Sequence, residues 1–139
     1  MTGSRSARTA ERAAIRAVRG ATARLSGRRA EVWAALWLLL KGYRILGFRL
    51  KTPQAEIDLL AQKGGVLAVV EVKSRTSLET ALEAVTRDQR QRLRRAGRNL
   101  AARRPALADK TVRLDLIALA PGRWPRHRPD AWADSLGEG

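Results

Sequence analysis

Apolar residues first gather between Arg28 and Lys41, where they cover nearly every face of a helix. This pattern predicts a helix that is packed into the core and ended by Gly42. Three shorter runs follow, at Tyr43–Leu50, Ala55–Gln62 and Val66–Lys73, and their length and apolar content are typical of strands.

Helical spacing returns over residues 78–104 and predicts one long helix, and a last strand is predicted over residues 111–119. The order α-β-β-β-α-β indicates a single α/β (α+β) domain over residues 27–120. Before it, residues 1–26 are predicted to form a basic arm, partly helical or disordered. After it, three prolines indicate a loose tail over residues 121–139.

Composition restricts the chemistry of this domain. The chain has 139 residues, the size of one ordinary domain, and no Cys and a single His. That excludes a disulfide scaffold, a thiolate zinc site and a His-based triad. Catalysis would therefore use carboxylates, Lys, Ser or Thr, or a hard cation held by oxygen atoms.

Charge points to the partner. With 28 Lys and Arg against 13 Asp and Glu, the formal net charge is +15, which favours nucleic acid or an anionic membrane surface. Residues 1–30 and residues 87–104 each carry eight Arg and one acidic residue, so binding is expected there.

Two segments of the chain bear on where the protein is located. The longest apolar run, Val32–Leu40, is far too short to span a membrane, so we expect no membrane contact and a cytoplasmic protein. The basic arm also has the composition of an organelle transit peptide, and we prefer the arm to that alternative.

A hairpin brings the candidate catalytic residues together. If Gly64 and Gly65 form a two-residue turn, Asp58 lies directly opposite Glu71 and shares its face, and Lys73 points to the same side. A turn one residue longer would bury the Asp58 carboxylate on an apolar face, so the polar pattern favours the first register.

Two carboxylates about 5 Å apart repel by roughly 3 kcal/mol at an effective dielectric constant of about 20, so a positive charge is expected between them. One interpretation is a solvated acidic patch that Lys73 screens. The other is a site for a hard cation, because carboxylate oxygens suit Mg²⁺ or Mn²⁺.

These segments resemble a known family. Glu31 in an N-terminal helix, Asp58 in AEIDLL, and Glu71 and Lys73 in VVEVKSR resemble the D-(x)n-E-x-K motif of the PD-(D/E)XK fold. More narrowly, the chain resembles the bacterial YraN family, which is related in architecture to archaeal Holliday-junction resolvases. The resemblance implies a restriction-endonuclease-like αβββαβ core with a mixed sheet flanked by helices.

The resemblance also implies residue roles. Asp58 and Glu71 would be ligands of Mg²⁺ or Mn²⁺, with the Val72 carbonyl as a further ligand and Glu31 as an auxiliary one. Lys73 would orient or deprotonate the attacking water. The family usually has Gly where this chain has Ala55.

Three residues in or next to the predicted helices can be interpreted in two ways. The family usually has Lys where this chain has Gln89, whose amide either completes the site or bonds to the backbone inside the core. Glu31 either complements the helix dipole or lies at the active-site edge. Ser77 is predicted to cap the next helix rather than to touch a phosphate.

Several further residues are assigned from charge or position. Arg75, at the exit of the strand, and a stripe of Arg87, Arg94 and Arg98 opposite the apolar helix face are candidate phosphate contacts, with a solvated surface as the alternative. Arg113 and Asp115 are expected to pair with each other. The tryptophans and the histidine are assigned to packing: Trp33 and Trp37 to the core, and Trp124, His127 and Trp132 to docking of the tail.

These observations support three hypotheses for the function. The first is a metal-dependent endonuclease that acts on DNA, including branched or structured DNA. The second is a nucleic-acid-binding protein on a nuclease scaffold with lost catalysis, and the third is an RNA-binding, ribosome-associated protein. DNA is favoured over RNA as the partner, and the pairing of two chains into a homodimer to cut both strands is left open.

Overall fold

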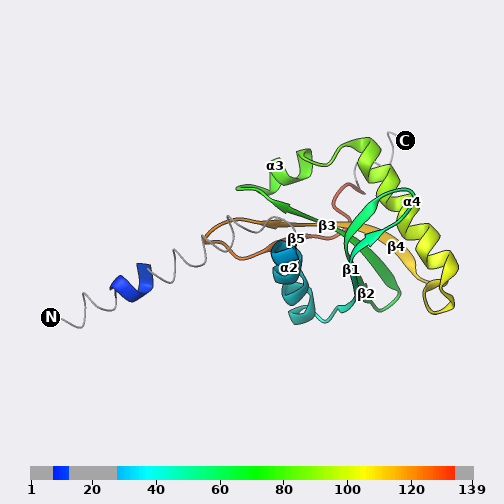
Figure 1. The fold of residues 1–139 in the computed structure, drawn as a ribbon, viewed down its shortest axis with the longest axis horizontal. Helices are drawn as coiled ribbons and strands as arrows, with labels where there is room; N and C mark the ends of the chain where they lie inside the picture. The colour runs from blue at the N-terminus through cyan, green and yellow to red at the C-terminus, as the bar shows by residue number, and fades with distance from the viewer. Residues whose placement is uncertain (1–7, 13–27, 134–139) are drawn as a thin grey trace.

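The computed structural model describes residues 8–12, which are helical, and residues 28–133 (Figure 1). Most of the basic arm predicted over residues 1–26 and the end of the tail lie outside the described residues. The helices are α2 (Arg28–Leu40), α3 (Leu78–Glu83), α4 (Arg87–Arg103) and the 3-10 turn η1 (Pro105–Leu107). The strands are β1 (Arg44–Lys51), β2 (Glu56–Lys63), β3 (Val66–Ser74), β4 (Thr111–Leu119) and β5 (Arg126–Arg128).

The strands form one mixed sheet in the order β1-β2-β3-β4-β5. Strands β3 and β4 are parallel and the other neighbours are antiparallel. Helix α2 covers one face, and α3 and α4 cover the other (Figure 1). The predicted αβββαβ core with a mixed sheet flanked by helices is confirmed. Among the described residues, no helix is long and apolar enough to cross a membrane.

Alternation along the strands divides the core into two layers. Leu60 and Val69 are fully buried on the side of α4, whereas Leu59 and Val70 are fully buried on the side of α2. On the first side, α4 approaches the sheet closely at Gly97, where an added Cβ would lie 2.6 Å from a methyl of Val69.

The long helix predicted over residues 78–104 is wrong, because the chain forms two helices there. Ser77 caps α3, as predicted, by accepting a hydrogen bond from the amide of Thr80. A second cap begins α4. The Thr86 hydroxyl accepts a hydrogen bond from the backbone N–H of Gln89, and the side-chain oxygen of Gln89 accepts one from the backbone N–H of Thr86. This capping box satisfies two amides that a continuous helix would bond internally.

Helix α2 turns its small residues towards the sheet. Ala30, Ala34 and Leu38 are buried, whereas Trp33 is 48% exposed. The helix is packed into the core, as predicted, but only through one face, and the assignment of Trp33 to the core is wrong. Alanine faces the sheet because its short side chain lets the helix approach closely, which leaves the large residues outside.

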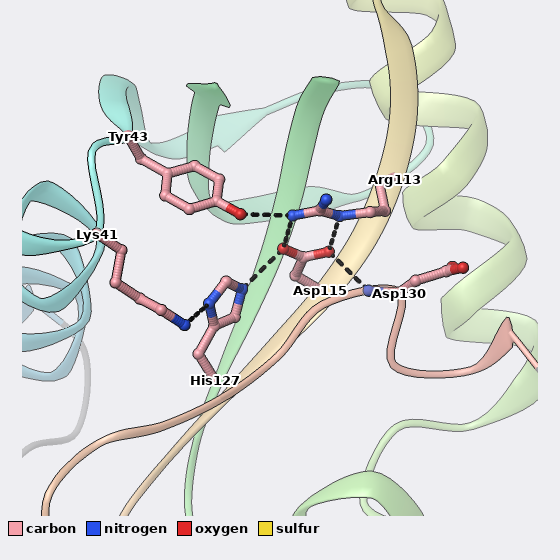
Figure 2. A network of polar contacts seen from close by, with 6 residues as sticks. All are labelled: Lys41, Tyr43, Arg113, Asp115, His127 and Asp130. Atoms are coloured by element: carbon pink, nitrogen blue, oxygen red, sulfur yellow. Dashed lines mark hydrogen bonds and ion pairs between the residues drawn. The ribbon is translucent and has the colours of Figure 1, made fainter. Parts of the chain in front are cut away.

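The tail predicted to be loose instead joins the sheet through β5, which pairs with β4. Asp115 on β4 is fully buried and holds this region together (Figure 2). It accepts two hydrogen bonds from the Arg113 guanidinium, at 2.7 and 2.8 Å, as the sequence predicted. His127 Nε2 lies 2.8 Å from the same carboxylate, and the amide of Asp130 donates to it at 3.0 Å.

The network continues to the turn between α2 and β1. Arg113 also donates to the hydroxyl of Tyr43 at 2.7 Å, and Lys41 Nζ lies 2.8 Å from His127 Nδ1 (Figure 2). Trp132 is 8% exposed and its indole donates to the Leu82 carbonyl at 3.3 Å. Docking of His127 and Trp132 is thus confirmed, whereas Trp124 is 79% exposed and contacts the Trp37 ring at its side.

The close approach of α4 to the sheet at Gly97 predicts that a side chain added there destabilises the fold. Gly97→Ala should lower the free energy of unfolding by about 1–3 kcal/mol, because the new methyl overlaps side chains of Val69 and Val112. The better helix propensity of alanine offsets at most about 1 kcal/mol. Urea denaturation measures the effect. Gly65→Ala is the matched control, because a Cβ there meets no atom within 4 Å, and equal stability of the two variants would contradict the prediction.

Candidate functional site

The hairpin of β2 and β3 has the predicted register. Lys63 pairs with Val66 across the two-glycine turn, and the ladder continues to Leu59 and Val70. The paired residues end there, and just beyond them the carboxyl groups of Asp58 and Glu71 lie near enough for each to shift the pKa of the other. The predicted register is therefore confirmed as far as Leu59 and Val70.

Lys73 and Val72 complete this cluster. Lys73 Nζ lies 3.5 Å from Glu71 Oε1, and the two side chains are 23% and 14% exposed. The amide of Val72 donates to Asp58 Oδ2 at 3.0 Å. Because the N–H and C=O of one strand residue face the same edge, the Val72 carbonyl also points towards Asp58. A solvated acidic patch does not describe this site, because Glu71 is largely shielded from water.

Both carboxyl groups are held away from their ordinary titration range. Burial, reinforced by the negative charge of Asp58, raises the pKa of Glu71 to about 8. Burial also raises the pKa of Asp58, against the hydrogen bond from Val72. Two buried carboxyls this close cannot both ionise cheaply, so the pair retains a proton near neutral pH.

The donor set for a cation is small. Asp58, Glu71 and the Val72 carbonyl offer oxygen atoms, which suit Mg²⁺ or Mn²⁺. Over residues 8–12 and 28–133, no group of three or more Asp, Glu, His or Cys side chains is placed to hold a metal ion. Water and phosphate oxygens would have to fill the remaining coordination positions.

Glu31 lies at the edge of this site but has its own partner. It is 5% exposed and accepts from Arg49 Nε with both carboxylate oxygens, at 3.0 and 2.9 Å. Burial raises the pKa of Glu31, Arg49 lowers it, and the charge of Asp58 raises it further. Glu31 also lies in the first turn of α2, where a carboxylate complements the helix dipole, so both interpretations stay predictions.

A cleft of about 180 Å³ opens beside Glu71, enough for several water molecules at roughly 30 Å³ each. It is lined by Ala55, Glu56, Glu71, Gln89, Arg92 and Leu93. Gln89 therefore reaches the site, but its amide oxygen caps α4 and is exposed rather than buried in the core.

Two lining residues, Glu56 and Arg92, were missed from the sequence, although a periodicity signal was present for each. Glu56 lies two residues before Asp58 on the same strand face, and Arg92 lies three residues after Gln89, one helical turn away. Arg92 forms an ion pair of 2.9 Å with Asp88, and both side chains are largely exposed.

The arginines predicted to contact phosphates are exposed in three of four cases. Arg75, Arg87 and Arg98 are exposed. Arg94 is not on the exposed face of α4: it is half-buried, with a buried Nη2 that has no hydrogen-bond partner. Burial and the neighbouring charge of Arg90 lower the pKa of Arg94. The stripe is wrong for Arg94, because α4 turns that position towards the tail.

Comparison with known proteins identifies relatives over most of the chain. The sequence model described as "Uncharacterised protein family UPF0102" matches residues 30–119. A UPF0102 protein of Caulobacter sp. (strain K31) is 71% identical over 129 residues, 93% of each chain. A UPF0102 protein of Parvibaculum lavamentivorans is 51% identical over 106 residues, which cover 76% of this chain and 80% of the relative.

The raised pKa of Glu71 predicts how stability depends on pH without metal. The folded state holds a proton that the unfolded chain has lost above its ordinary value of 4.5, so this stabilisation is complete below that value. It should disappear as pH rises through about 8. Between about pH 6 and about pH 9 the free energy of unfolding should fall by about 2 kcal/mol in EDTA.

Urea denaturation at both pH values measures this fall. Glu71→Gln removes the titrating group and should flatten the dependence, whereas Glu83→Gln, which changes an exposed carboxyl on α3, should not. A Glu71→Gln variant with the same pH dependence as the unaltered protein would show that Glu71 does not hold the proton.

Proposed function

Since the chain belongs to the UPF0102 family, the family that its motifs identified as YraN, we propose a function from the site that this member carries. The protein is a metal-dependent endonuclease that hydrolyses phosphodiester bonds of DNA, including branched or structured DNA, in the cytoplasm.

The observation that carries this proposal is the pair of carboxyl groups of Asp58 and Glu71, which are largely shielded from water and lie beside Lys73. A fold gains nothing from forcing two buried carboxyls together, and strongly perturbed groups of this kind gather at functional sites. A divalent cation would replace the proton, and Asp58, Glu71 and the Val72 carbonyl would hold it. When bound, Mg²⁺ or Mn²⁺ supplies charge neutralisation for a phosphate and acidifies a water molecule.

Lys73 supplies the remaining chemistry from the chain itself. Its ammonium group lies beside Glu71 and has three donors, so it can orient an attacking water and stabilise the negative charge that develops on the phosphate. No covalent nucleophile is needed. Arg92 lines the same cleft and can bind a neighbouring phosphate of the substrate.

Charge supports nucleic acid as the substrate. The net charge of +15 favours a polyanion, and α4 presents Arg92 and Arg98 on the side of the sheet where Asp58 and Glu71 lie. Double-stranded DNA is gripped mainly through phosphates, which exposed arginines contact without regard to sequence.

One observation favours a second candidate, a nucleic-acid-binding protein that has lost catalysis. Glu31 is engaged by Arg49, and the oxygen of Gln89 is engaged by the cap of α4. Two auxiliary groups of the site are thus already occupied, which leaves fewer ligands for a metal.

Cleavage of labelled linear, flapped and four-way DNA, and of RNA, separates the two candidates. With Mg²⁺ or Mn²⁺ present, the unaltered protein should cut DNA. Lys73→Ala should lower the cleavage rate at least about 100-fold and leave DNA binding nearly unchanged, because one positive charge among 28 adds little affinity. Lys110→Ala, which removes a lysine at the far end of the sheet, is the matched control.

Calorimetric titration with Mn²⁺ tests the ligands separately from the reaction. Asp58→Ala with Glu71→Ala should abolish Mn²⁺ binding. Binding of DNA without cleavage under any metal, together with Mn²⁺ binding that survives the double change, would establish the second candidate instead.

Arg92 yields a prediction about affinity. If it neutralises one phosphate, Arg92→Gln should weaken DNA binding for every sequence and reduce the slope of log affinity against log salt by about 0.9. Arg103→Gln, at the end of the same helix, should leave the slope unchanged. Fluorescence anisotropy over a salt series measures both, and equal slopes for the two variants would remove Arg92 from the interface.

A further inference from the structure

Arg49 on β1 has a backbone conformation that its residue type does not favour. Its φ is +47°, in the left-handed region that glycine, asparagine and aspartate enter more easily than a long side chain does. Its neighbours Phe48 and Leu50 pair with β2, with the residues on either side of Asp58. Arg49 therefore stands opposite Asp58, but these two residues are left out of the pairing. Strain of this kind persists only where other contacts hold it, and it gathers at functional sites.

The contact that holds Arg49 is an ion pair with Glu31. Arg49 Nε lies 3.0 and 2.9 Å from the two carboxylate oxygens of Glu31, which is 5% exposed. An arginine that only neutralises a carboxylate commonly binds it as a fork, with two nitrogens on two oxygens. Here a single nitrogen contacts both oxygens, so the ion pair does not use the two Nη groups.

Those Nη groups are available to a second anion. Over the part of the chain that the structure describes, neither of them forms a hydrogen bond. The Arg49 side chain is 38% exposed, whereas that of Glu31 is 7% exposed. A guanidinium binds phosphate as it binds a carboxylate, through parallel N–H donors. One nitrogen of Arg49 is thus fixed by the fold, and the others can take a phosphate.

The position of Arg49 would put such a phosphate at the candidate site. Neighbouring strands lie about 4.8 Å apart, so Arg49 is one strand away from Asp58. The negative charge of Asp58 raises the pKa of Glu31, which places Glu31 in the same neighbourhood. Arg49 and Glu31 therefore lie on the β1 side of the Asp58–Glu71 pair.

We propose that Arg49 binds a phosphate of the nucleic acid through its Nη groups, and that Glu31 is the positioning residue for Arg49 rather than a metal ligand. This role rests on the proposed function, because it adds a substrate contact to the same site. Lys73 on β3 and Arg49 on β1 then approach the substrate from the two sides of Asp58. The ion pair with Glu31 stabilises the strained backbone that aims the guanidinium.

Two other roles for the ion pair predict different results. If Arg49 only neutralised the buried Glu31 carboxylate, removing both charges together would change neither DNA binding nor metal binding. If Glu31 were a metal ligand, Mn²⁺ binding would weaken whenever Glu31 lost its carboxylate. A double variant, Glu31→Gln with Arg49→Gly, separates these roles.

Metal binding by the double variant tests the role of Glu31. The variant removes one negative and one positive charge, so the net charge of the site is unchanged and no carboxylate is left buried without its partner. Glycine adopts a positive φ without strain, so the domain should unfold at nearly the same temperature as the unaltered chain. Calorimetry should give the same Mn²⁺ affinity for both. An affinity lowered by about tenfold or more would make Glu31 a metal ligand and overturn the positioning role.

DNA binding tests the phosphate contact. Fluorescence anisotropy is measured over a salt series at constant Mg²⁺, with Lys73→Ala present in every variant so that the DNA stays intact. Adding the double change should reduce the slope of log affinity against log salt by about 0.9, although the net charge is the same. Arg44→Gln is the matched control, because Arg44 is exposed at the other end of β1 and should leave the slope unchanged. A slope that the double change does not reduce would overturn the proposal.

The same measurements distinguish failure of this role from failure of the proposed function. An unaltered chain that cuts no DNA and binds no Mn²⁺ would refute the proposed function, and the slope would still decide whether Arg49 contacts phosphate. A chain that cuts DNA, with a slope that the double change leaves intact, would refute only the role of Arg49. Arg49→Asn is the second variant in case the double variant does not fold. Asparagine tolerates a positive φ and should reduce the slope equally.

Discussion

The turn between β2 and β3 sets the register on which both the core and the candidate site depend. Gly64 has a φ of +55°, a conformation that glycine adopts without strain, and it lets the chain reverse within two residues. A slip of one residue would exchange every side chain between the two faces of the strand. Leu59 and Leu60 would then leave their layers, and Asp58 would face apolar side chains. The burial of the leucines therefore keeps the two carboxyls opposite each other.

The two groups of buried carboxyls show how the same residue type serves structure or chemistry. Burial alone would raise the pKa of Asp115, but hydrogen bonds from His127 and Arg113 and from the amide of Asp130 lower it. That carboxylate is fully satisfied and ties the tail to the sheet. Glu71 has one lysine and a second acid as neighbours, and its pKa rises instead. A pair of buried carboxyl groups whose pKa values are raised in this way is the one that can take up a cation.

Local signals made the strands, the hairpin and the Ser77 cap predictable, because each depends on residues close in sequence. The break between α3 and α4 was not predicted because the apolar spacing of a helix continues across it. Thr86 and Gln89 nevertheless have the spacing of a capping box. Strand β5 has three residues and no apolar alternation, and its pairing with β4 and the contact of His127 with Asp115 reveal it. Likewise, no local pattern links Glu31 to Arg49, 18 residues away.

Helix α2 shows a further limit on what the sequence can predict. A helix that is apolar on every side does not indicate which side meets the sheet, and here the alanines do because they allow close approach. The same packing leaves Val32, Trp33, Leu36, Leu39 and Leu40 exposed on the layer of α2, whereas the candidate site and its arginines lie on the layer of α4.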